Sequence, residues 1–449
     1  MARDRRELDR SRVPSGRAER LASLGVLAGK LALGGAAEGV RRLAGASADA
    51  GHVLLSGANA RRLVASLSSM RGAAMKLGQL LSLEAEDLLA PEVADALAAL
   101  RDAGHAMPQA QLERVLRDAY GARWRDRFAE FDPEPIAAAS IGQVHAARAT
   151  DGRDLALKIQ YPGVARSIDS DVDNLAAALR LARILPGNVD FAPLLEEAKR
   201  QLRDEADYAK EASFLARYRA LLADESRVVV PAVHDDLTTG TILAMDRLYG
   251  MPLEELCSPE YDDAARNDAA ELLLRIVLRE FFEFHFVQSD PNFANYLLLP
   301  DRRIGLLDLG AGYDADPALC RAYAKLFRAS AAADREAVRA VATEIGFVAP
   351  DDAARDAEAV LDLVWLATEP FRRSGPYDFG ASDLPSRARA KSAEIVFEHG
   401  FWRPPPPATL FLQRKLGGTF LLCVKLRAKV DARALVERVL DEFEIATTA

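Results

Sequence analysis

Two acids and an amide lie close together in an apolar part of the chain. Asp290 and Asn295 are separated by four residues, and Asp308 follows within the apolar run LLDLG at 306–310. Carboxylates are costly to bury among Leu and Ile unless a cation or hydrogen bonds compensate them. The pattern therefore predicts that these three side chains surround a bound cation.

The spacing of Asp290 and Asn295 is typical of the catalytic loop of protein kinases. In that loop the acid orients or deprotonates the acceptor, and the Asn holds a magnesium ion. Asp308-Leu309-Gly310 then corresponds to the D-F-G element, with Leu for Phe, and Asp308 would ligate Mg²⁺ at the nucleotide phosphates. Taken singly, Asp290 is as well explained as a helix-end acid and Asp308 as a strand-end turn, but the two in register are more specific.

A lysine upstream completes the kinase pattern. Lys158 ends the run LALK at 155–158, which matches the V-A-I-K strand whose Lys reaches the α and β phosphates. We expect a long helix over about 191–220, and Glu211 on it is the candidate partner of Lys158. An exposed lysine on a half-buried strand is the alternative.

Further acids precede Glu211 on the predicted helix. Asp207 lies four residues earlier and would share its face, whereas Glu205 would not. A solvated acidic face explains the same residues equally well.

The segment PEPIAAASIGQVHAAR, residues 133–148, occupies the place of the kinase glycine-rich loop. Alanine stands where glycine is expected, and only Gly142 remains. Such a loop could still cover phosphates with backbone N–H groups, although Ala cannot adopt positive φ cheaply. A short helix is an equal alternative, because Ala is the best helix former. The predicted nucleotide-binding residues are Ala137, Ala138, Ala139, Ser140, Gly142, Lys158, Met245 and Leu248.

The predicted elements place these residues in an α+β, two-lobed arrangement. At 449 residues the chain exceeds one typical domain. We expect an arm at 1–50, a helical extension at 51–127, a first lobe at 128–247 and a mostly helical second lobe at 248–449. The first lobe reads as strand, strand, long helix, strand, strand, the last two strands lying in RVVVPAVHD and GTILAMDRL. The second contains a buried helix at 271–286 and two strand-like fragments at 294–299 and 303–310.

Composition excludes several classes of protein. The net charge of −9 argues against broad nucleic-acid binding, so no nucleic-acid partner is expected. Cys257, Cys320 and Cys423 show neither disulfide-framework nor zinc spacing, and with no secretory signal the protein is predicted to be cytoplasmic. The apolar stretch 21–40 is Ala- and Gly-rich and contains Lys30, so we expect a packed or amphipathic helix there. Its flanking arginines leave peripheral contact with the inner face of an anionic membrane open.

Five ordered motifs together resemble the UbiB family of atypical, protein-kinase-like proteins of ubiquinone biosynthesis. They are KLGQ at 76–79, AAASIGQVH at 137–145, DEADYAKEA at 204–212, QSDPN at 288–292 and LQRKLGGTFLLCVKLRA at 412–428. The resemblance extends from about Met70 to the C-terminal end. QSDPN, with Ser289 for Thr, resembles the QTDPN subgroup.

The resemblance implies a protein-kinase-like fold that uses ATP and Mg²⁺. Lys158 and Glu211 correspond to the family's ion pair, Asn295 and Asp308 to its magnesium ligands, and Asp290 to its catalytic-loop acid.

A regulatory signature is also implied. Lys76, Gly78 and Gln79 correspond to a helix that lies across the protein-substrate cleft and meets the acids matching Glu205 and Asp207. The implied function is an ATPase or unorthodox kinase that supports ubiquinone biosynthesis at a membrane, with quinone-biosynthesis proteins or lipid precursors as partners. A true protein or small-molecule kinase, or a nucleotide-gated scaffold without turnover, are the alternatives.

Overall fold

The chain forms two compact units in the computed structural model, which describes residues 106–139, 141–181, 192–398, 401 and 406–448. Unit 1 comprises the described residues up to Ala216 together with Ala232–Arg247, and unit 2 comprises Arg217–Pro231 and the chain from Leu248 onward. The predicted arm, the signature residues Lys76, Gly78 and Gln79, and the loop residue Ser140 lie outside the described residues. The predicted domain boundaries stay predictions.

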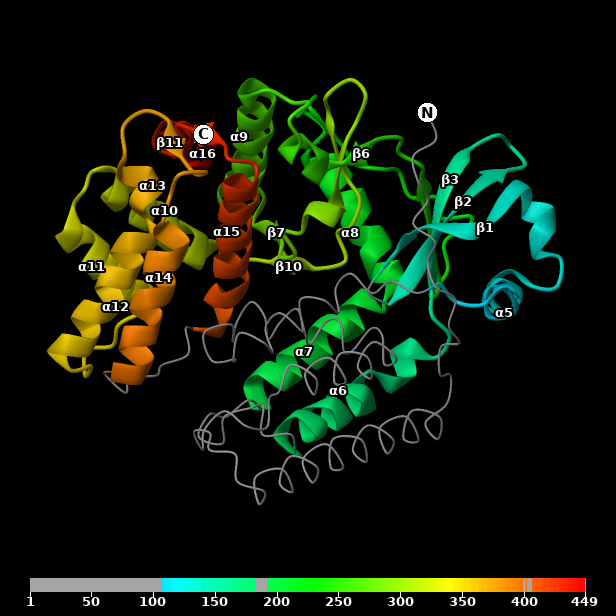
Figure 1. The fold of residues 1–449 in the computed structure, drawn as a ribbon, viewed down its shortest axis with the longest axis horizontal. Coiled ribbons are helices and arrows are strands. Elements are labelled where there is room, and N and C mark those ends of the chain that lie inside the picture. Colours follow the sequence, from blue (N-terminus) through cyan, green and yellow to red (C-terminus); the bar gives the residue numbers. More distant parts are fainter. Residues whose placement is uncertain (1–105, 140, 182–191, 399–400, 402–405, 449) are drawn as a thin grey trace, which may run out of the picture. The chain divides into compact units, whose positions relative to one another are not determined.

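Unit 1 contains a four-stranded antiparallel sheet in the order β1-β2-β3-β5 (Figure 1). Its strands are β1 (Phe128–Ala138), β2 (Gly142–Ala149), β3 (Asp154–Gln160) and β5 (Ile242–Asp246). The predicted hairpin is β2–β3, and its turn contains Gly152 at φ +92°, a conformation that favours glycine. The helical alternative for the Ala-rich segment is wrong, because Ala137 and Ala138 lie in β1 opposite Val144 and Gln143.

The helices of unit 1 differ from the prediction. They are α5 (Gln109–Tyr120), the 3₁₀ turn η3 (Trp124–Arg127), α6 (Val164–Leu181), α7 (Ala192–Glu205) and α8 (Tyr208–Leu221), the last of which ends in unit 2. The prediction of a single helix over 191–220 is wrong, because the helix is interrupted at Ala206 and Asp207. Gln160 Nε2 donates to the Ala206 carbonyl at 2.9 Å, and Asp207 Oδ1 accepts the Lys210 N–H at 3.1 Å as the cap of α8.

Unit 2 contains a second four-stranded sheet in the order β4-β9-β8-β6. Its strands are β4 (Val228–Val229), β9 (Ile304–Leu306), β8 (Tyr296–Leu298) and β6 (Met251–Pro252). The predicted fragments at 294–299 and 303–310 therefore form the antiparallel pair β8–β9. The segment RVVVPAVHD, expected to form one strand of the first lobe, divides between the two sheets. Its β4 part pairs with β9 in parallel, whereas Val233 bridges Met245 on β5 in the antiparallel sense.

A mostly buried helix leads into the loop that carries Asp290. Helix α9 (Asp263–Arg279) continues as a π-helical turn, η5 (Glu280–Phe284), and His285 then adopts left-handed φ +46°. The chain next forms β7 (Phe286–Gln288), which pairs with β10 (Gly312–Asp314). The burial predicted for 271–286 is thus found in most of the segment, with Phe281, Phe282 and Phe286 fully covered.

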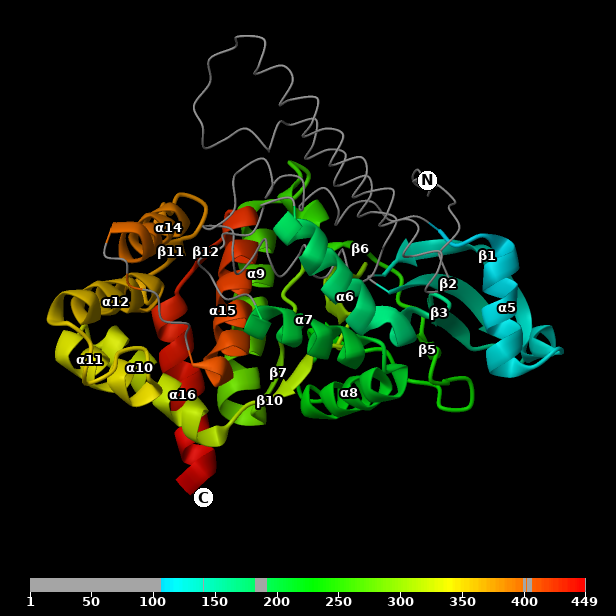
Figure 2. The same cartoon turned by 90° about the horizontal axis from the view of Figure 1, so that it is seen from below.

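Further helices complete unit 2 (Figure 2). Helix α15 (Pro407–Lys425) contacts α9 and β7, beside which both views show it. The other elements are η4 (Leu253–Cys257), η6 (Phe293–Asn295), α10 (Pro317–Ala331), α11 (Arg335–Ile345), α12 (Ala354–Ala367), α13 (Glu369–Arg372), β11 (Tyr377–Asp378), α14 (Leu384–Ala393), η7 (Glu394–Glu398), β12 (Lys429–Val430) and α16 (Ala432–Thr448). Within the described part of the chain, no helix has the length and hydropathy needed to cross a bilayer.

Candidate active site

Lys158 and Glu211 form a buried ion pair in unit 1. Lys158 lies on β3, which has neighbouring strands on both sides, and Glu211 lies in the first turn of α8. Lys158 Nζ is 2.6 Å from Glu211 Oε1, and the two side chains are 8% and 0% exposed. Such a pair offsets its desolvation only with a close, hydrogen-bonded geometry. The pair fixes Lys158 at a defined position on the sheet.

Gly142 allows α8 to approach the sheet. A Cβ at this position would lie 2.5 Å from the Ile159 carbonyl oxygen and 2.7 Å from the Tyr208 hydroxyl. Tyr208 is the first residue of α8, and Lys158 Nζ lies 5.4 Å from its ring centroid. Gly142 is therefore required by close packing and not by positive φ. The turn before it is closed by the Ala139 N–H, which donates to the Gly142 carbonyl at 2.9 Å.

The other predicted residues of unit 1 lie on several different elements. Glu205 ends α7, and Asp207 is an exposed helix cap outside α8, so the predicted helical face shared by Asp207 and Glu211 is wrong. Ala137 and Ala138 are exposed on β1, whereas Met245 is buried on β5 opposite Ala156.

Asp290 and Asn295 are joined directly in unit 2. Asp290 follows β7, so the alternative explanation of Asp290 as a helix-end acid is wrong. Asn295 Nδ2 donates to the Asp290 carbonyl at 2.8 Å and lies 3.4 Å from Asp290 Oδ2. The Asn295 carbonyl accepts the Leu307 N–H at 2.9 Å, next to Asp308. The structure therefore brings together the three residues from which the sequence prediction began. Leu248, predicted to bind nucleotide, is half-buried in unit 2, and its Cδ1 would lie 2.9 Å from a Cβ at Gly305 of β9.

Asn295 and Asp308 offer oxygen atoms of the kind that Mg²⁺ prefers. Asn295 uses its Nδ2 toward Asp290, which leaves its amide oxygen as the atom for a metal ion. Asp308 Oδ1 accepts the Gly310 N–H at 3.0 Å, which orients the carboxylate. The described residues contain no group of three His, Cys, Asp or Glu side chains that could hold a metal. An ion here would take its remaining ligands from phosphate and water, as Mg²⁺ commonly does.

Three residues behind these acids were missed by the sequence analysis. Gln288 Nε2 donates to the carbonyl of Asp290 at 2.8 Å and to that of Asp308 at 3.3 Å. Lys415 Nζ donates to Gln288 Oε1 at 3.2 Å, and Arg414 Nη2 lies 3.4 Å from Asp290 Oδ1. Their only sequence signal was membership of the familial segments QSDPN and LQRKLGG.

Lys415 also has a buried counter-ion. Its Nζ lies 3.2 Å from Glu280 Oε2, and both side chains are 2% exposed. Burial alone would lower the pKa of Lys415, but the charge of Glu280 and the neighbouring Tyr296 raise it overall. The charge of Glu280 therefore favours the protonated form of Lys415.

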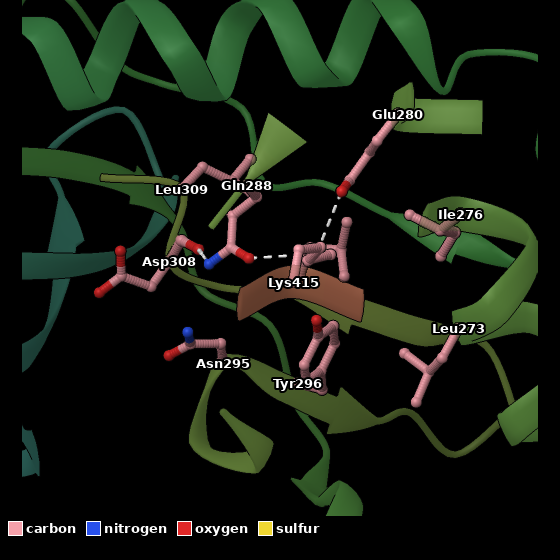
Figure 3. A pocket seen from close by; sticks show the side chains of 10 residues that line it. Leu273, Ile276, Glu280, Gln288, Asn295, Tyr296, Asp308, Leu309 and Lys415 are labelled. Carbon is pink, nitrogen blue, oxygen red and sulfur yellow. Dashed lines mark hydrogen bonds and ion pairs between the residues drawn. The ribbon is translucent and has the colours of Figure 1, made fainter. Parts of the chain in front are cut away.

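A pocket within unit 2 is lined by both the candidate metal ligands and this pair (Figure 3). In this view Asn295 and Asp308 lie at one side of it, Lys415 lies in the middle, and Glu280 lies on the side of Ile276. The remaining lining residues are Leu273, Ile276, Gln288, Tyr296, Leu306 and Leu309.

The sheet with its Lys–Glu pair and the Asp–Asn–Asp loops define a protein-kinase-like α+β protein of the phosphoryl-transfer class. The sequence model of the ABC1 atypical kinase-like domain matches residues 99–342, and the chain belongs to this family. This family includes the UbiB proteins, which the five sequence motifs indicated.

Relatives and a solved structure agree with this assignment. The chain is 39% identical to the mitochondrial atypical kinase COQ8 of Schizosaccharomyces pombe, covering 97% of this chain and 71% of that one. It is 38% identical to COQ8B of Rattus norvegicus, covering 96% and 82%. The structure of Rv3197 from Mycobacterium tuberculosis in complex with erythromycin is similar with a TM-score of 0.59 at 24% identity, over 83% of this chain and 93% of that one. This last likeness shows the fold.

Proposed function

We propose that the protein binds ATP with Mg²⁺ and hydrolyses it as an atypical kinase-like ATPase that supports ubiquinone biosynthesis. The observation that carries the proposal is the hydrogen-bonded link from Asp290 through Asn295 to the residue before Asp308. It joins an acid for the acceptor to two oxygen ligands for a metal, as phosphoryl transfer requires. The buried Lys158–Glu211 pair supports it independently.

Each residue has a distinct proposed role. Asn295 and Asp308 hold Mg²⁺, which would neutralise charge on the β and γ phosphates. Lys158, held by Glu211, binds the α and β phosphate oxygens. Asp290 orients water, or an acceptor hydroxyl, in line with the γ phosphate.

Arg414 qualifies the role proposed for Asp290. Its guanidinium pairs with Asp290 Oδ1, and its own side chain is buried. Asn295 Nδ2 lies 3.4 Å from the other oxygen, Oδ2, so both carboxylate oxygens have protein partners and we assign Asp290 the orientation of the nucleophile.

The remaining nucleotide-binding and regulatory roles follow the family resemblance. We propose that the β1–β2 turn covers the phosphates with its backbone, and that Met245 and Leu248 contact the base. Lys76, Gly78 and Gln79 are proposed to regulate access together with Glu205 and Asp207. Quinone-biosynthesis proteins, lipid precursors and an anionic membrane surface are the proposed partners, and the relatives named COQ8 support the same setting.

ATP hydrolysis by the full chain tests the proposal. We expect Mg²⁺-dependent phosphate release that rises with cardiolipin-containing liposomes and is lost in Asp308→Asn, because the substitution removes a charged metal ligand. A chain lacking residues 1–50 should retain basal hydrolysis and lose the lipid effect.

Three outcomes would contradict parts of the proposal. Undiminished Mg²⁺-nucleotide binding by Asp308→Asn would refute the metal assignment. Tight binding without phosphate release would favour a kinase awaiting its acceptor or a scaffold without turnover. Equal lipid stimulation without residues 1–50 would refute the role of the arm.

A further inference from the structure

Lys415 is linked to both acid-bearing loops through one intervening residue, Gln288. Its Nζ is shared between the carboxylate of Glu280 and the Oε1 atom of Gln288, at 3.2 to 3.3 Å from each. An isolated buried lysine would be strongly unfavourable, so Lys415 requires the opposite charge of Glu280.

Gln288 connects Lys415 to both loops through the two ends of its amide group. Its Nε2 donates to the backbone carbonyls of Asp290 and Asp308, while its Oε1 accepts the Asp290 N–H at 3.2 Å. The same amide therefore binds the segment before Asn295 and the segment after β9 at once. These bonds set the spacing between the two acidic loops.

Lys415 and the Asp290 N–H together determine which way this amide points, because both donate to Oε1. An amide group has an accepting and a donating end that are nearly equal in shape, but an ammonium group only donates. Lys415 Nζ therefore holds Oε1 on its own side and leaves Nε2 toward the two carbonyls. A flipped amide would place its oxygen against the carbonyl oxygens of Asp290 and Asp308, and both loops would lose their donor.

We infer that Lys415 is a positioning residue, which fixes the amide of Gln288 and thereby holds the loops of Asp290 and Asp308 at the spacing that the metal site needs. This inference rests on the proposed function and deepens it. Glu280 supplies the opposite charge, and the π-helical turn that begins at Glu280 carries its side chain into the buried interior. If the Lys415–Glu280 pair were only structural, replacing both residues by neutral ones would leave the Mg²⁺ affinity unchanged.

The test separates charge balance from positioning with Lys415→Met, Glu280→Gln and the double variant. Each single variant leaves one buried charge without its partner and should lower the melting temperature. The double variant is neutral and similar in volume, so its melting temperature should recover. It still lacks the donor to Gln288, so the Mg²⁺ concentration for half-maximal ATP-analogue binding should stay raised by about tenfold, as is typical when a metal ligand loses its supporting partner.

Gln288→Glu supplies a second measurement in case the double variant does not fold. The substitution keeps an oxygen for Lys415 but replaces the donating end, so it should raise the Mg²⁺ requirement similarly. Lys325→Met, at an exposed lysine paired with Glu344 on the surface, is the matched control and should bind as wild type does.

The outcomes distinguish this inference from the proposed function. A wild-type Mg²⁺ requirement in the folded double variant, or in Gln288→Glu, would overturn the positioning role of Lys415. The proposed function would still stand. Absence of Mg²⁺-dependent nucleotide binding in wild type, with Asp308→Asn unchanged from it, would refute the proposed function and the inference with it.

Discussion

At the scale of single residues, two of the buried lysines, Lys158 and Lys415, have neighbours that differ in kind. Lys158 on β3 has its carboxylate partner on a helix, in an arrangement that leaves the lysine close to Tyr208. Lys415 divides its donors between a carboxylate and an amide. The first is suited to holding an anionic ligand, and the second to holding other protein groups in place.

Lys158→Met should cost about 3–5 kcal/mol of stability, because it leaves Glu211 buried without its cation. It should also abolish ATP-analogue binding. Urea unfolding and equilibrium binding measure the two effects.

Lys210→Met is the control for this prediction. Lys210 lies on the same helix as Glu211 and pairs with Asp204, but its side chain is 37% exposed. Loss of that pair should cost roughly 0–1 kcal/mol. Equal losses in the two variants would show that burial of the Lys158 pair contributes nothing.

Sequence reasoning identified Lys158, Asp290, Asn295 and Asp308 because each occupies a fixed offset within a local motif. Lys415 was not found, since a lysine flanked by arginine and leucine in a helical pattern reads as solvent-exposed. Its burial depends on Glu280 and Gln288, which are more than a hundred residues away along the chain. Only contacts of this range distinguish a buried lysine from an exposed one.

At the scale of elements, α15 approaches the catalytic-loop segment at a glycine. A Cβ at Gly418 would lie 2.0 Å from Pro291 Cγ, next to Asp290, whereas no described residue beyond the helix's own backbone lies within 4 Å of a Cβ at Gly417. The two glycines are adjacent in one helix and meet different surroundings, so they make a matched pair.

Gly418→Ala should therefore displace Pro291, cost about 1–3 kcal/mol and lower ATPase activity. Gly417→Ala should raise stability by up to about 1 kcal/mol, because Ala is the better helix former, and leave activity unchanged. Thermal unfolding and phosphate release measure both variants. Similar behaviour of the two would contradict the close approach of α15.

Elements that depend on local periodicity were predicted well, and those that depend on distant partners were not. The β2–β3 hairpin and the buried helix at 271–286 follow from alternation, turn residues and continuous apolar character. The break between α7 and α8 has no Gly or Pro, and its only local sign is Asp207 as a helix cap. The two-residue strand β4 gives no information about its partner, which the fold of unit 2 selects.

At the scale of the whole molecule, each unit contains a histidine whose pKa is lowered. Burial lowers the pKa of His145 in unit 1, where Nδ1 bonds the Asp132 carbonyl at 2.9 Å. Burial, and then the charge of Arg321, lowers the pKa of His285 in unit 2. Folding therefore favours the neutral form of both side chains.

The contribution of these two histidines to the unfolding free energy should be complete above about pH 6.5, the ordinary pKa of His. It should be lost as the pH drops below that value, because the unfolded chain then binds protons that the folded chain does not. His145→Gln and His285→Gln should each flatten this fall. Urea titrations between pH 8 and pH 5 measure it, with hydrogen exchange assigning the change to one unit. An unchanged slope in His145→Gln would show that its burial has no such effect.

The division of the chain between the two units also has a consequence for synthesis. During translation, β5 can complete the sheet of unit 1 as soon as Asp246 has left the ribosome, although the preceding segment Arg217–Pro231 belongs to unit 2. Strand β4 within that segment must wait for β9 at Ile304–Leu306 to be made. For the same reason no single backbone cut releases both units whole: a cut after Ala216 separates unit 1 from β5, and a cut after Arg247 separates unit 2 from β4.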